Sequence, residues 1–354
     1  MSVLLGYVLY AVGIAGMFLI LIAPHEAGHF LVAKLYKVRI LEFSIGAGTK
    51  LWSTTRDGTL YAIRALPILG YVRMGGMEAG DFNEPNGFHT KTPLQRIAIL
   101  AAGPIANFLV AMVLIAGFGL TQLNGDPGKV TLVLAKTPAA EAGLIAGDRI
   151  HAIDGKQVNS PGDIQKEEVA AAGKPVTITG VHADGKPFTL EVTPVCKADG
   201  SCAIGVGIAR MVTPLTALKD GVTFPYLAVQ IIVQGFGQLI SGQVQGGLLG
   251  RFGLTGPIGI AAITTDAVSQ GPPAYIYLVA LFSVALGVTN LLPLLALDGG
   301  RIVVVVVEWL RRRPFDRNTE LNFQRWGLVA LLALAAVISF LDIQRIASGQ
   351  FGLH

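Results

Sequence analysis

Four long apolar stretches dominate the pattern of hydrophobic and polar positions: residues 3–31, 97–123, 274–307 and 326–341. A helix needs about 20 such residues, within a range of roughly 17–25, to cross the hydrocarbon core of a bilayer. Each stretch therefore predicts a transmembrane helix, the fourth at the short end of that range. We expect an α-helical polytopic membrane protein with four transmembrane helices.

A fifth uncharged stretch, residues 221–250, allows two interpretations. Gln230, Gln234 and Gln238 recur every four residues and draw a polar stripe along one face of a helix. That stripe favours an amphipathic helix lying on the membrane surface, although the basic face of many such helices is missing. The alternative is a glycine-rich fifth span, which the length and the low charge also permit.

Between the first two spans, residues 42–78 carry a pattern of short strands. Residues 60–66 partly alternate between apolar and polar positions before Pro67, and residues 70–76 follow. We expect strands joined by a turn close to the membrane, forming a membrane-associated β loop. An exposed edge there could pair with an extended substrate chain; the alternative is a purely structural hairpin.

The longest insertion, residues 124–210, predicts one soluble α+β domain. Strands are expected at 130–134, 150–158, 176–181 and 188–192, and a helix at 163–172. The dipeptide Asp184-Gly185 is typical of a hairpin turn. Cys196 and Cys202 flank a short loop at the end of this domain. A disulfide is compatible with a location outside the cytoplasm, and the spacing leaves bonded and free thiols both open.

Composition and charge fit this organisation. Hydrophobic residues make up 52% of the chain and charged residues 14%, against about 25% charged in typical soluble domains. The basic excess lies in two loops, one between the first two spans and one at Arg311-Arg312-Arg313 after the third. By the positive-inside rule both loops face the cytoplasm, so the α+β insert and both termini are expected outside. A basic excess confined to these loops indicates membrane orientation and no nucleic-acid partner.

Together these patterns predict eight consecutive parts. They are a first span (1–36), a cytoplasmic loop with the membrane-associated β hairpin (37–93), a second span (94–123), the external α+β domain (124–210), a segment with the surface helix (211–272), a third span (273–310), a cytoplasmic loop (311–324), and a fourth span with the C-terminal tail (325–354).

The candidate chemistry lies at the end of the first span, in Pro24-His25-Glu26-Ala27-Gly28-His29. Two histidines four residues apart share one face of a helix, so both imidazoles can reach one tetrahedral Zn²⁺. Glu26 can act as general base on water without being a ligand. Ionisable residues are costly in a span and are functional candidates by default. The plainer interpretation is a helix end whose polar side chains face headgroups or water.

Catalytic zinc needs a third protein ligand, and Asp298 is the leading candidate. It is an acidic residue within the apolar third stretch, which also carries Asn290 and Pro293. Pro293 and the following glycines loosen the helix, so that Asp298 can turn inward. The alternative is a carboxylate that pairs with Arg301 at the interface.

These motifs, in this order, resemble the site-2 protease family of bacterial intramembrane zinc metalloproteases that carry a PDZ domain. The resemblance covers nearly the whole chain and rests on residues 25–29, 66–74, 103–108, 142–150, 256–260 and 290–300. It implies that His25, His29 and Asp298 bind one Zn²⁺ per chain, and that Glu26 activates water. Asn290 would hold the substrate backbone or assist the developing oxyanion.

The resemblance also implies a substrate class. A transmembrane segment of a single-span protein, such as an anti-sigma factor already cut outside the membrane, would be unwound and cleaved. The β loop would hold it as an added strand at Gly70, Tyr71, Val72, Arg73 and Met74. The extracytoplasmic PDZ domain would filter substrates by size and could bind a peptide or its C-terminus. The protein is then expected in the bacterial cytoplasmic membrane, in contact with lipid.

Two alternatives belong to other classes. A transporter would also combine broken helices with buried carboxylates, although the sequence has no evident inverted repeat. A non-catalytic PDZ membrane scaffold would keep the fold and would not need Glu26.

Overall fold

The structure is a computed structural model of the 354-residue chain. It describes residues 3–78, 81–82, 84–123, 126–134, 137–196, 200–209, 212–243, 254–294 and 296–348. The chain divides into two compact units. One comprises Met1–Ala116 and Asp220–His354, and the other is Gly117–Lys219.

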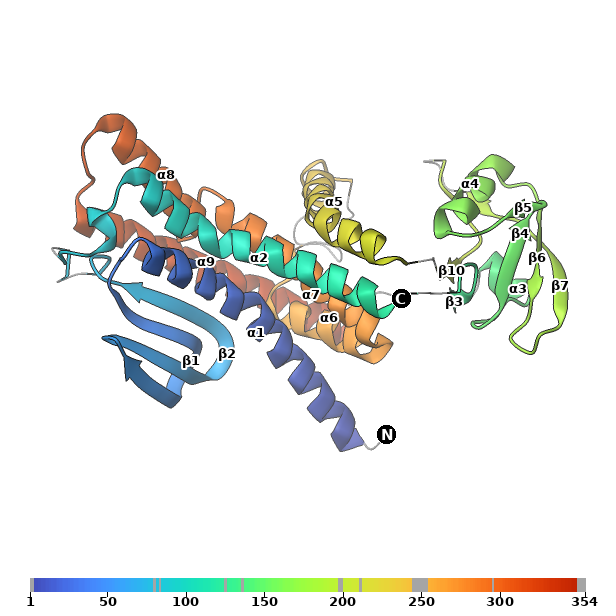
Figure 1. The fold of residues 1–354 in the computed structure, drawn as a ribbon, viewed down its shortest axis with the longest axis horizontal. Coiled ribbons are helices and arrows are strands. Elements are labelled where there is room, and N and C mark those ends of the chain that lie inside the picture. Colours follow the sequence, from blue (N-terminus) through green and yellow to red (C-terminus); the bar gives the residue numbers. More distant parts are fainter. Residues whose placement is uncertain are drawn as a thin grey trace. The chain divides into compact units, whose positions relative to one another are not determined.

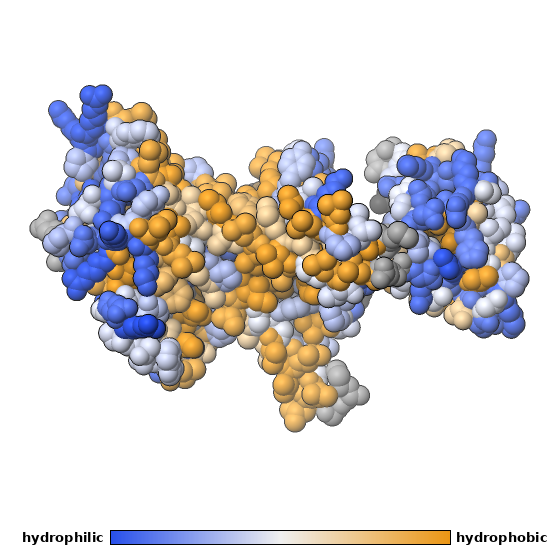
Figure 2. All heavy atoms as spheres, in the orientation of Figure 1, coloured by the Kyte–Doolittle hydropathy of each residue, from blue (hydrophilic) through white to orange (hydrophobic). Residues whose placement is uncertain are grey.

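Long helices build the first unit (Figure 1). They are α1 (Val3–Leu35), α2 (Pro93–Thr121), α5 (Pro214–Ile240), α6 (Pro257–Gln270), α7 (Pro272–Leu291), α8 (Asp298–Arg311) and α9 (Arg317–Ala347), with a short 3₁₀ turn η1 (Phe88–Thr90) before α2. In the described part of the chain, α1, α2, α5, α7 and α9 are long and apolar enough to cross a membrane. Figure 2 shows hydrophobic side chains along these helices and hydrophilic ones gathered at one end of the unit. A helical membrane protein is therefore confirmed, whereas the count of four spans stays a prediction.

The third apolar stretch, residues 273–310, was expected to be a span loosened at Pro293, and in the structure it is two separate helices. α7 ends at Leu291 and α8 begins at Asp298. Leu292 is extended, as expected for a residue before proline, and Pro293 has no N–H to continue the helix. A Cβ on Gly299 would lie 2.3 Å from the carbonyl oxygens of Leu291 and Leu292, so only glycine fits this turn. The break makes Asp298 the first residue of a new helix.

Helix α6 was not anticipated from the sequence. The hydroxyl of Tyr275 on α7 donates to the carbonyl of Gly13 on α1 (2.8 Å), and Met17 of α1 packs between α6 and α7. At the start of α6, the buried carboxylate of Asp342 from α9 accepts hydrogen bonds from the N–H groups of Gly256 and Gly259 (2.8 and 2.9 Å). A carboxylate at a helix N-terminus satisfies otherwise unpaired donors, so Asp342 joins α9 to α6.

The polar stripe of glutamines lies on α5. The apolar side of this helix packs against α2 and α7 through Phe224 and Ala228, which share a buried cluster with Ala111 and Val284. Both interpretations of this helix, as a surface element and as a span, remain proposals.

The β loop is a hairpin of two long strands, β1 (Ile40–Arg56) and β2 (Thr59–Met74), joined at Asp57-Gly58. Residues 42–45 of β1 lie between two parts of β2. They pair with residues 60–63 on one side and with residues 70–73 on the other. Strands were expected at 60–66 and 70–76, but their partner, β1, was missed. Two of its buried positions hold the polar residues Glu42 and Ser44, which hides the alternation that marks a strand.

The second unit contains the expected α+β elements. They are β3 (Val130–Val133), α3 (Pro138–Glu141), β4 (Arg149–Ile153), β5 (Lys156–Gln157), α4 (Pro161–Ala171), β6 (Val176–Val181), β7 (Pro187–Val192), β8 (Val195–Cys196), β9 (Cys202–Ala203) and β10 (Val206–Ile208). One sheet has the order β5-β4-β6-β7, and β10 pairs with β3. Isoleucines from several elements form its core.

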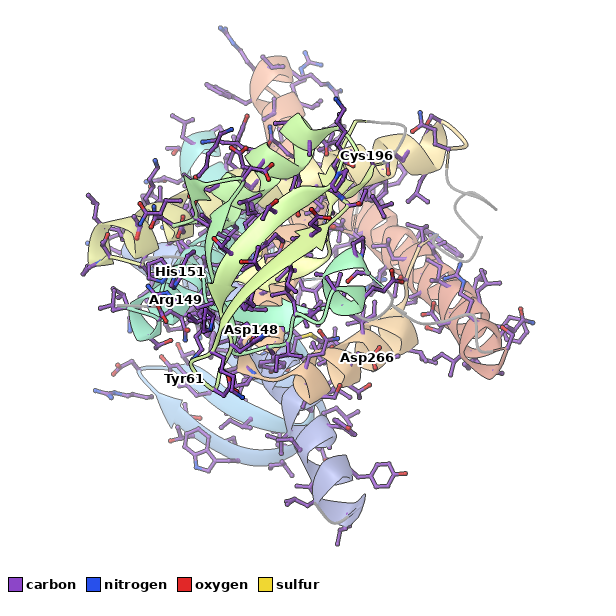
Figure 3. All side chains as sticks on the ribbon, turned by 90° about the vertical axis from the view of Figure 1, so that its right-hand side faces the viewer. Tyr61, Asp148, Arg149, His151, Cys196 and Asp266 are labelled. Atoms are coloured by element: carbon purple, nitrogen blue, oxygen red, sulfur yellow. A yellow bond between two sulfur atoms is a disulfide. The ribbon has the colours of Figure 1, made fainter. Side chains whose placement is uncertain are left out.

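A disulfide and a buried carboxylate fix loops of this unit (Figure 3). A disulfide joins Cys196 to Cys202. The fully buried carboxylate of Asp148 accepts from the N–H groups of Ile145 and Ala183 (3.0 and 3.1 Å) and lies 3.1 Å from the Nδ1 of His182.

Candidate metal centre

Three side chains from two distant helices converge at one point. Nε2 of His25 lies 3.2 Å from Nε2 of His29, and each of these nitrogens lies 3.3 Å from Oδ2 of Asp298. Both imidazoles are buried. In the described part of the chain this is the one group of three His, Cys, Asp or Glu side chains close enough to share an ion.

The spacing of these atoms fits zinc. Ligand atoms at 2.0–2.1 Å from a tetrahedral Zn²⁺ lie about 3.3 Å apart, which is one edge of the tetrahedron. The three measured separations match that edge. Two imidazole nitrogens and one carboxylate oxygen are a donor set that zinc prefers, and the set leaves a fourth position open. The residues present therefore fit a catalytic zinc site.

Glycine at two positions lets α2 approach the histidines. A Cβ on Gly28 would lie 2.3 Å from the carbonyl oxygen of Ala102, so α1 and α2 touch here backbone to backbone. A Cβ on Gly103 would lie 2.3 Å from Nε2 of His29 and 2.9 Å from Cε1 of His25. Any side chain at position 103 would collide with both imidazoles.

Helix α2 also holds the far side of each imidazole. Nδ1 of His29 lies 2.8 Å from the carbonyl oxygen of Ile99, and Nδ1 of His25 lies 3.3 Å from the side-chain amide of Asn107. Metal-binding histidines almost always make such a second hydrogen bond, which fixes the ring and its tautomer. Sequence reasoning missed both partners: a backbone carbonyl has no sequence signal, and Asn107 was noted only within the stretch 103–108.

Glu26 lies beside the cluster, and its carboxylate makes no hydrogen bond or ion pair with any described residue. Its neighbour is the backbone of Gly70 on β2, where an added Cβ would come within 2.9 Å of Cγ of Glu26. Glu26 therefore lies between the metal-site histidines and the edge strand, and its carboxylate has no partner among the described residues.

The five residues expected to hold substrate end β2, at an edge of the sheet. Residues 70–73 pair on one side with 42–45, and no described strand pairs with their other side. The hydroxyl of Tyr71 donates to Oε1 of Glu42 (2.7 Å) and accepts from Arg64 (2.7 Å), which ties this edge to the sheet. Val72 and Met74 pack into the cluster beneath, and Arg73 lies 3.7 Å from Glu78.

Asn290, the other expected contact, lies in the last turn of α7 and makes no hydrogen bond with any described residue. Along the chain it lies close to the break before Asp298, and in the described part no hydrogen bond joins it to His25, His29 or Asp298.

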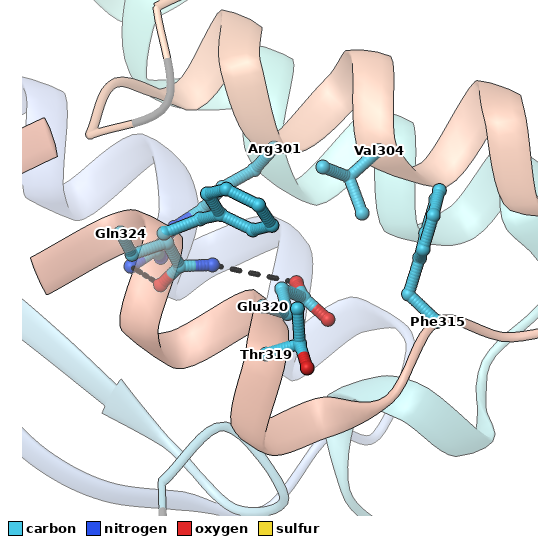
Figure 4. Close-up of a pocket in the computed structure, with 7 residues that line it drawn as sticks. Arg301, Val304, Phe315, Thr319, Glu320 and Gln324 are labelled. Atoms are coloured by element: carbon cyan, nitrogen blue, oxygen red, sulfur yellow. Dashed lines mark hydrogen bonds between the residues drawn. The ribbon is translucent and has the colours of Figure 1, made fainter. Parts of the chain in front are cut away.

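The alternative pairing of Asp298 with Arg301 is not formed. Arg301 instead donates to Oε1 of Gln324 on α9 (3.0 Å), and Gln324 donates to Glu320 (3.3 Å). Figure 4 shows these bonds beside a cavity of about 200 Å³ between α8 and α9.

An ion cluster that the sequence did not reveal fixes the other end of α8. Glu308 bonds to Arg96 of α2 (2.6 Å) and to Arg317 of α9 (2.8 Å), and the first pair is buried. The helix that carries Asp298 is thus attached to two neighbours near its C-terminal end.

The sequence matches the profile of Peptidase family M50 over residues 13–334. It is 30% identical over 405 residues to the zinc metalloprotease RasP of Geobacillus kaustophilus, a match that covers 91% of this chain and 94% of that protein. RasP of Bacillus licheniformis is 30% identical over 406 residues, covering 91% and 96%. A solved PDZ domain of an SdrC-like protein from Listeria monocytogenes matches 25% of this chain and 92% of its own at 26% identity, with a TM-score of 0.22 that is too low to establish a common fold.

Proposed function

The chain belongs to peptidase family M50 and is a zinc-dependent intramembrane metalloendopeptidase, and on that premise we propose that His25, His29 and Asp298 hold the zinc and Glu26 is the general base. The observation that supports this assignment is the spacing of the three donor atoms: each pair lies about 3.3 Å apart, which is the edge of a tetrahedral zinc site. Membership of a peptidase family argues against the two alternative hypotheses, a transporter and a non-catalytic PDZ scaffold.

The roles of the residues follow from their positions. Zinc, when bound, supplies Lewis-acid polarisation of the scissile carbonyl and of a water molecule. A carboxylate oxygen of Glu26 takes one proton from that water as the water oxygen attacks the carbonyl carbon. Glu26 then gives the proton to the amide nitrogen as the carbon–nitrogen bond breaks. A carboxylate without another partner is suited to holding this proton in both steps.

The substrate is proposed to bind as an extended chain. An intact transmembrane helix hides its carbonyls in its own hydrogen bonds, so the segment must unwind before cleavage. The free side of residues 70–73 offers unpaired backbone groups to such a chain, which is β-augmentation. Because Gly70 lies against Glu26, a strand added there passes the general base. Asn290, with its amide unpaired among the described residues, would hold the substrate backbone or assist the oxyanion.

The physiological substrates are proposed from the family resemblance. They are single-span membrane proteins, such as an anti-sigma factor, that have first lost their external domain. The α+β unit is proposed to be an extracytoplasmic PDZ domain that excludes untrimmed proteins and that could bind a peptide or its C-terminus. Its disulfide supports an oxidising compartment. This orientation places both termini outside the cytoplasm of a bacterial cell.

One experiment tests the proposal. The full chain is purified in detergent, its zinc is counted by elemental analysis, and cleavage of a tagged single-span substrate is followed for wild type, Glu26→Gln and His29→Ala. We expect about one zinc per chain in wild type and Glu26→Gln, cleavage by wild type alone, and loss of both properties in His29→Ala. Exposed Glu78→Gln is the matched control. Cleavage by Glu26→Gln at the wild-type rate would reject the assignment.

A further inference from the structure

The two imidazoles of the metal centre are held from behind by different chemical groups. His29 faces a backbone carbonyl, that of Ile99, at 2.8 Å. His25 faces a side-chain amide, that of Asn107, at 3.3 Å. Asn107 is fully buried, and both contacts come from α2.

The direction of these hydrogen bonds decides which ring nitrogen can bind a metal. A neutral imidazole has one N–H and one lone pair, and a ligating nitrogen must carry the lone pair. The carbonyl of Ile99 can only accept, so Nδ1 of His29 carries the proton and Nε2 is left with its lone pair toward the cluster. For His25 to present Nε2 in the same way, its Nδ1–H also needs an acceptor.

Asn107 can supply either a donor or that acceptor, because its amide has both. With Nδ2 placed toward Nδ1 of His25, the amide oxygen is buried without a partner among the described residues. A half-turn of the amide sets Oδ1 against Nδ1–H and moves the unpaired end to the nitrogen. Either orientation leaves one end of the amide unpaired, so a metal at Nε2 of His25 decides between them and selects the acceptor orientation.

We infer that Asn107 is a positioning residue for the metal centre: its Oδ1 accepts the Nδ1–H of His25 and thereby presents Nε2 to zinc. The inference rests on the proposed role of His25 as a ligand.

The surroundings keep Asn107 in place. Its backbone carbonyl accepts a hydrogen bond from Oγ of Ser283 on α7 (2.8 Å), which joins the same residue to a third helix. A Cβ on Gly287, one turn further along α7, would lie 3.1 Å from the carbonyl oxygen of Pro104. With α1 on one side and α7 on the other, the amide of Asn107 cannot swing toward lipid.

Zinc affinity separates this role from simple helix packing. Full-length protein is stripped of metal, and its affinity for zinc is measured by competition with a chromophoric chelator, for wild type, Asn107→Leu, Asn107→Asp, Ser283→Ala and His25→Ala. Thermal unfolding of each metal-free variant reports packing separately. We expect Asn107→Leu to bind zinc about 10–100-fold more weakly, the usual effect of losing such a partner. Asn107→Asp keeps an acceptor oxygen and should bind at least as tightly as wild type. Ser283→Ala removes only the bond to the backbone and should leave the affinity unchanged.

Each other outcome has a defined meaning. Wild-type affinity in Asn107→Leu, together with loss of zinc in His25→Ala, would overturn the inference and leave the proposed active site standing. Equal losses in the Leu and Asp variants would overturn it too, because the acceptor is retained in one of them. Retention of zinc by His25→Ala would reject the proposed site itself.

Discussion

Gly70 of the edge strand lies directly against Glu26 of α1. A Cβ at position 70 would come within 2.9 Å of Cγ of Glu26 and 2.8 Å of Cγ2 of Ile22. The backbone of the strand therefore passes Glu26, the proposed general base, with no side chain between them. This contact joins the two functions expected of the first hundred residues, which are water activation on the helix and substrate capture on the sheet.

The first prediction concerns this contact. Gly70→Ala adds one methyl group that has no space, so either the strand or Glu26 must shift. Displacement of a catalytic group by about 1 Å can cost about 100-fold in rate, and we expect cleavage to fall about 10- to 100-fold with zinc content unchanged. Gly117→Ala is the control, because an added Cβ there meets nothing within 4 Å. Full activity of Gly70→Ala would show that the strand does not constrain Glu26.

The second prediction concerns Gly103, where α2 packs against the two imidazoles. Its substitution by alanine places a methyl group 2.3 Å from Nε2 of His29, so this imidazole, a proposed zinc ligand, must shift. Alanine favours a helix over glycine by about 1 kcal/mol, so α2 itself is not weakened. We expect Gly103→Ala to fold and to retain little zinc in elemental analysis of the purified protein. A variant with one zinc per chain would contradict the assignment of this imidazole to the metal.

The third prediction concerns the buried ion pair between Arg96 and Glu308. Removing the one partner of a buried charge costs about 3–5 kcal/mol. Glu308 keeps Arg317 at 2.8 Å when Arg96 is replaced, so Arg96→Met should lower the thermal unfolding temperature clearly but by less than this full cost. The exposed pair Arg73–Glu78 is the comparison, and Arg73→Met should change stability by about 0–1 kcal/mol. Similar effects of the two substitutions would mean that the buried pair does not hold α8.

The fourth prediction is a pH dependence of stability. Burial, together with the positive charges of Arg317 and Arg96, lowers the pKa of His89 to about 3, from 6.5 in an unstructured chain. The unfolded chain binds this proton first as the pH falls. Above pH 6.5 His89 is neutral in both states and costs no stability. As the pH falls from 6.5 to about 3, the unfolded chain takes up the proton and the free energy of unfolding decreases. The loss is at most about 1.4 kcal/mol per pH unit.

Thermal unfolding of the detergent-solubilised protein at pH 7.5 and 5 measures this effect. His89→Gln cannot take up the proton, so its unfolding temperature should fall less on acidification than that of wild type. Substitution of the exposed His151 by Gln should leave the wild-type slope unchanged. Equal slopes for all three proteins would show that His89 does not contribute.

The fifth prediction concerns orientation. Cys196 and Cys202 are bonded to each other, so a cysteine introduced elsewhere would be the reactive thiol. In cells whose cytoplasmic membrane is intact and whose outer layers have been made permeable, Gly185→Cys should react with a membrane-impermeant maleimide. Arg312→Cys should react only after the membrane is opened. The opposite pattern would reverse the proposed topology.

The sequence predicts the metal centre better than its surroundings. The spacing of His25 and His29 is a local property of one helix, and the cost of a carboxylate in an apolar stretch singles out Asp298. By contrast, the support of the imidazoles by Ile99 comes from a backbone carbonyl, which every residue has. Residues 40–56 form a strand with polar side chains at buried positions, so periodicity could not reveal it.

Helix α8 is held near both ends: Asp298, its first residue, lies against the two imidazoles, and Glu308, in its last turn, binds Arg96. A short helix held near both ends moves as one rigid body. A displacement of the connection between α8 and α9 would therefore be passed along α8 to Asp298, the proposed oxygen ligand of the zinc.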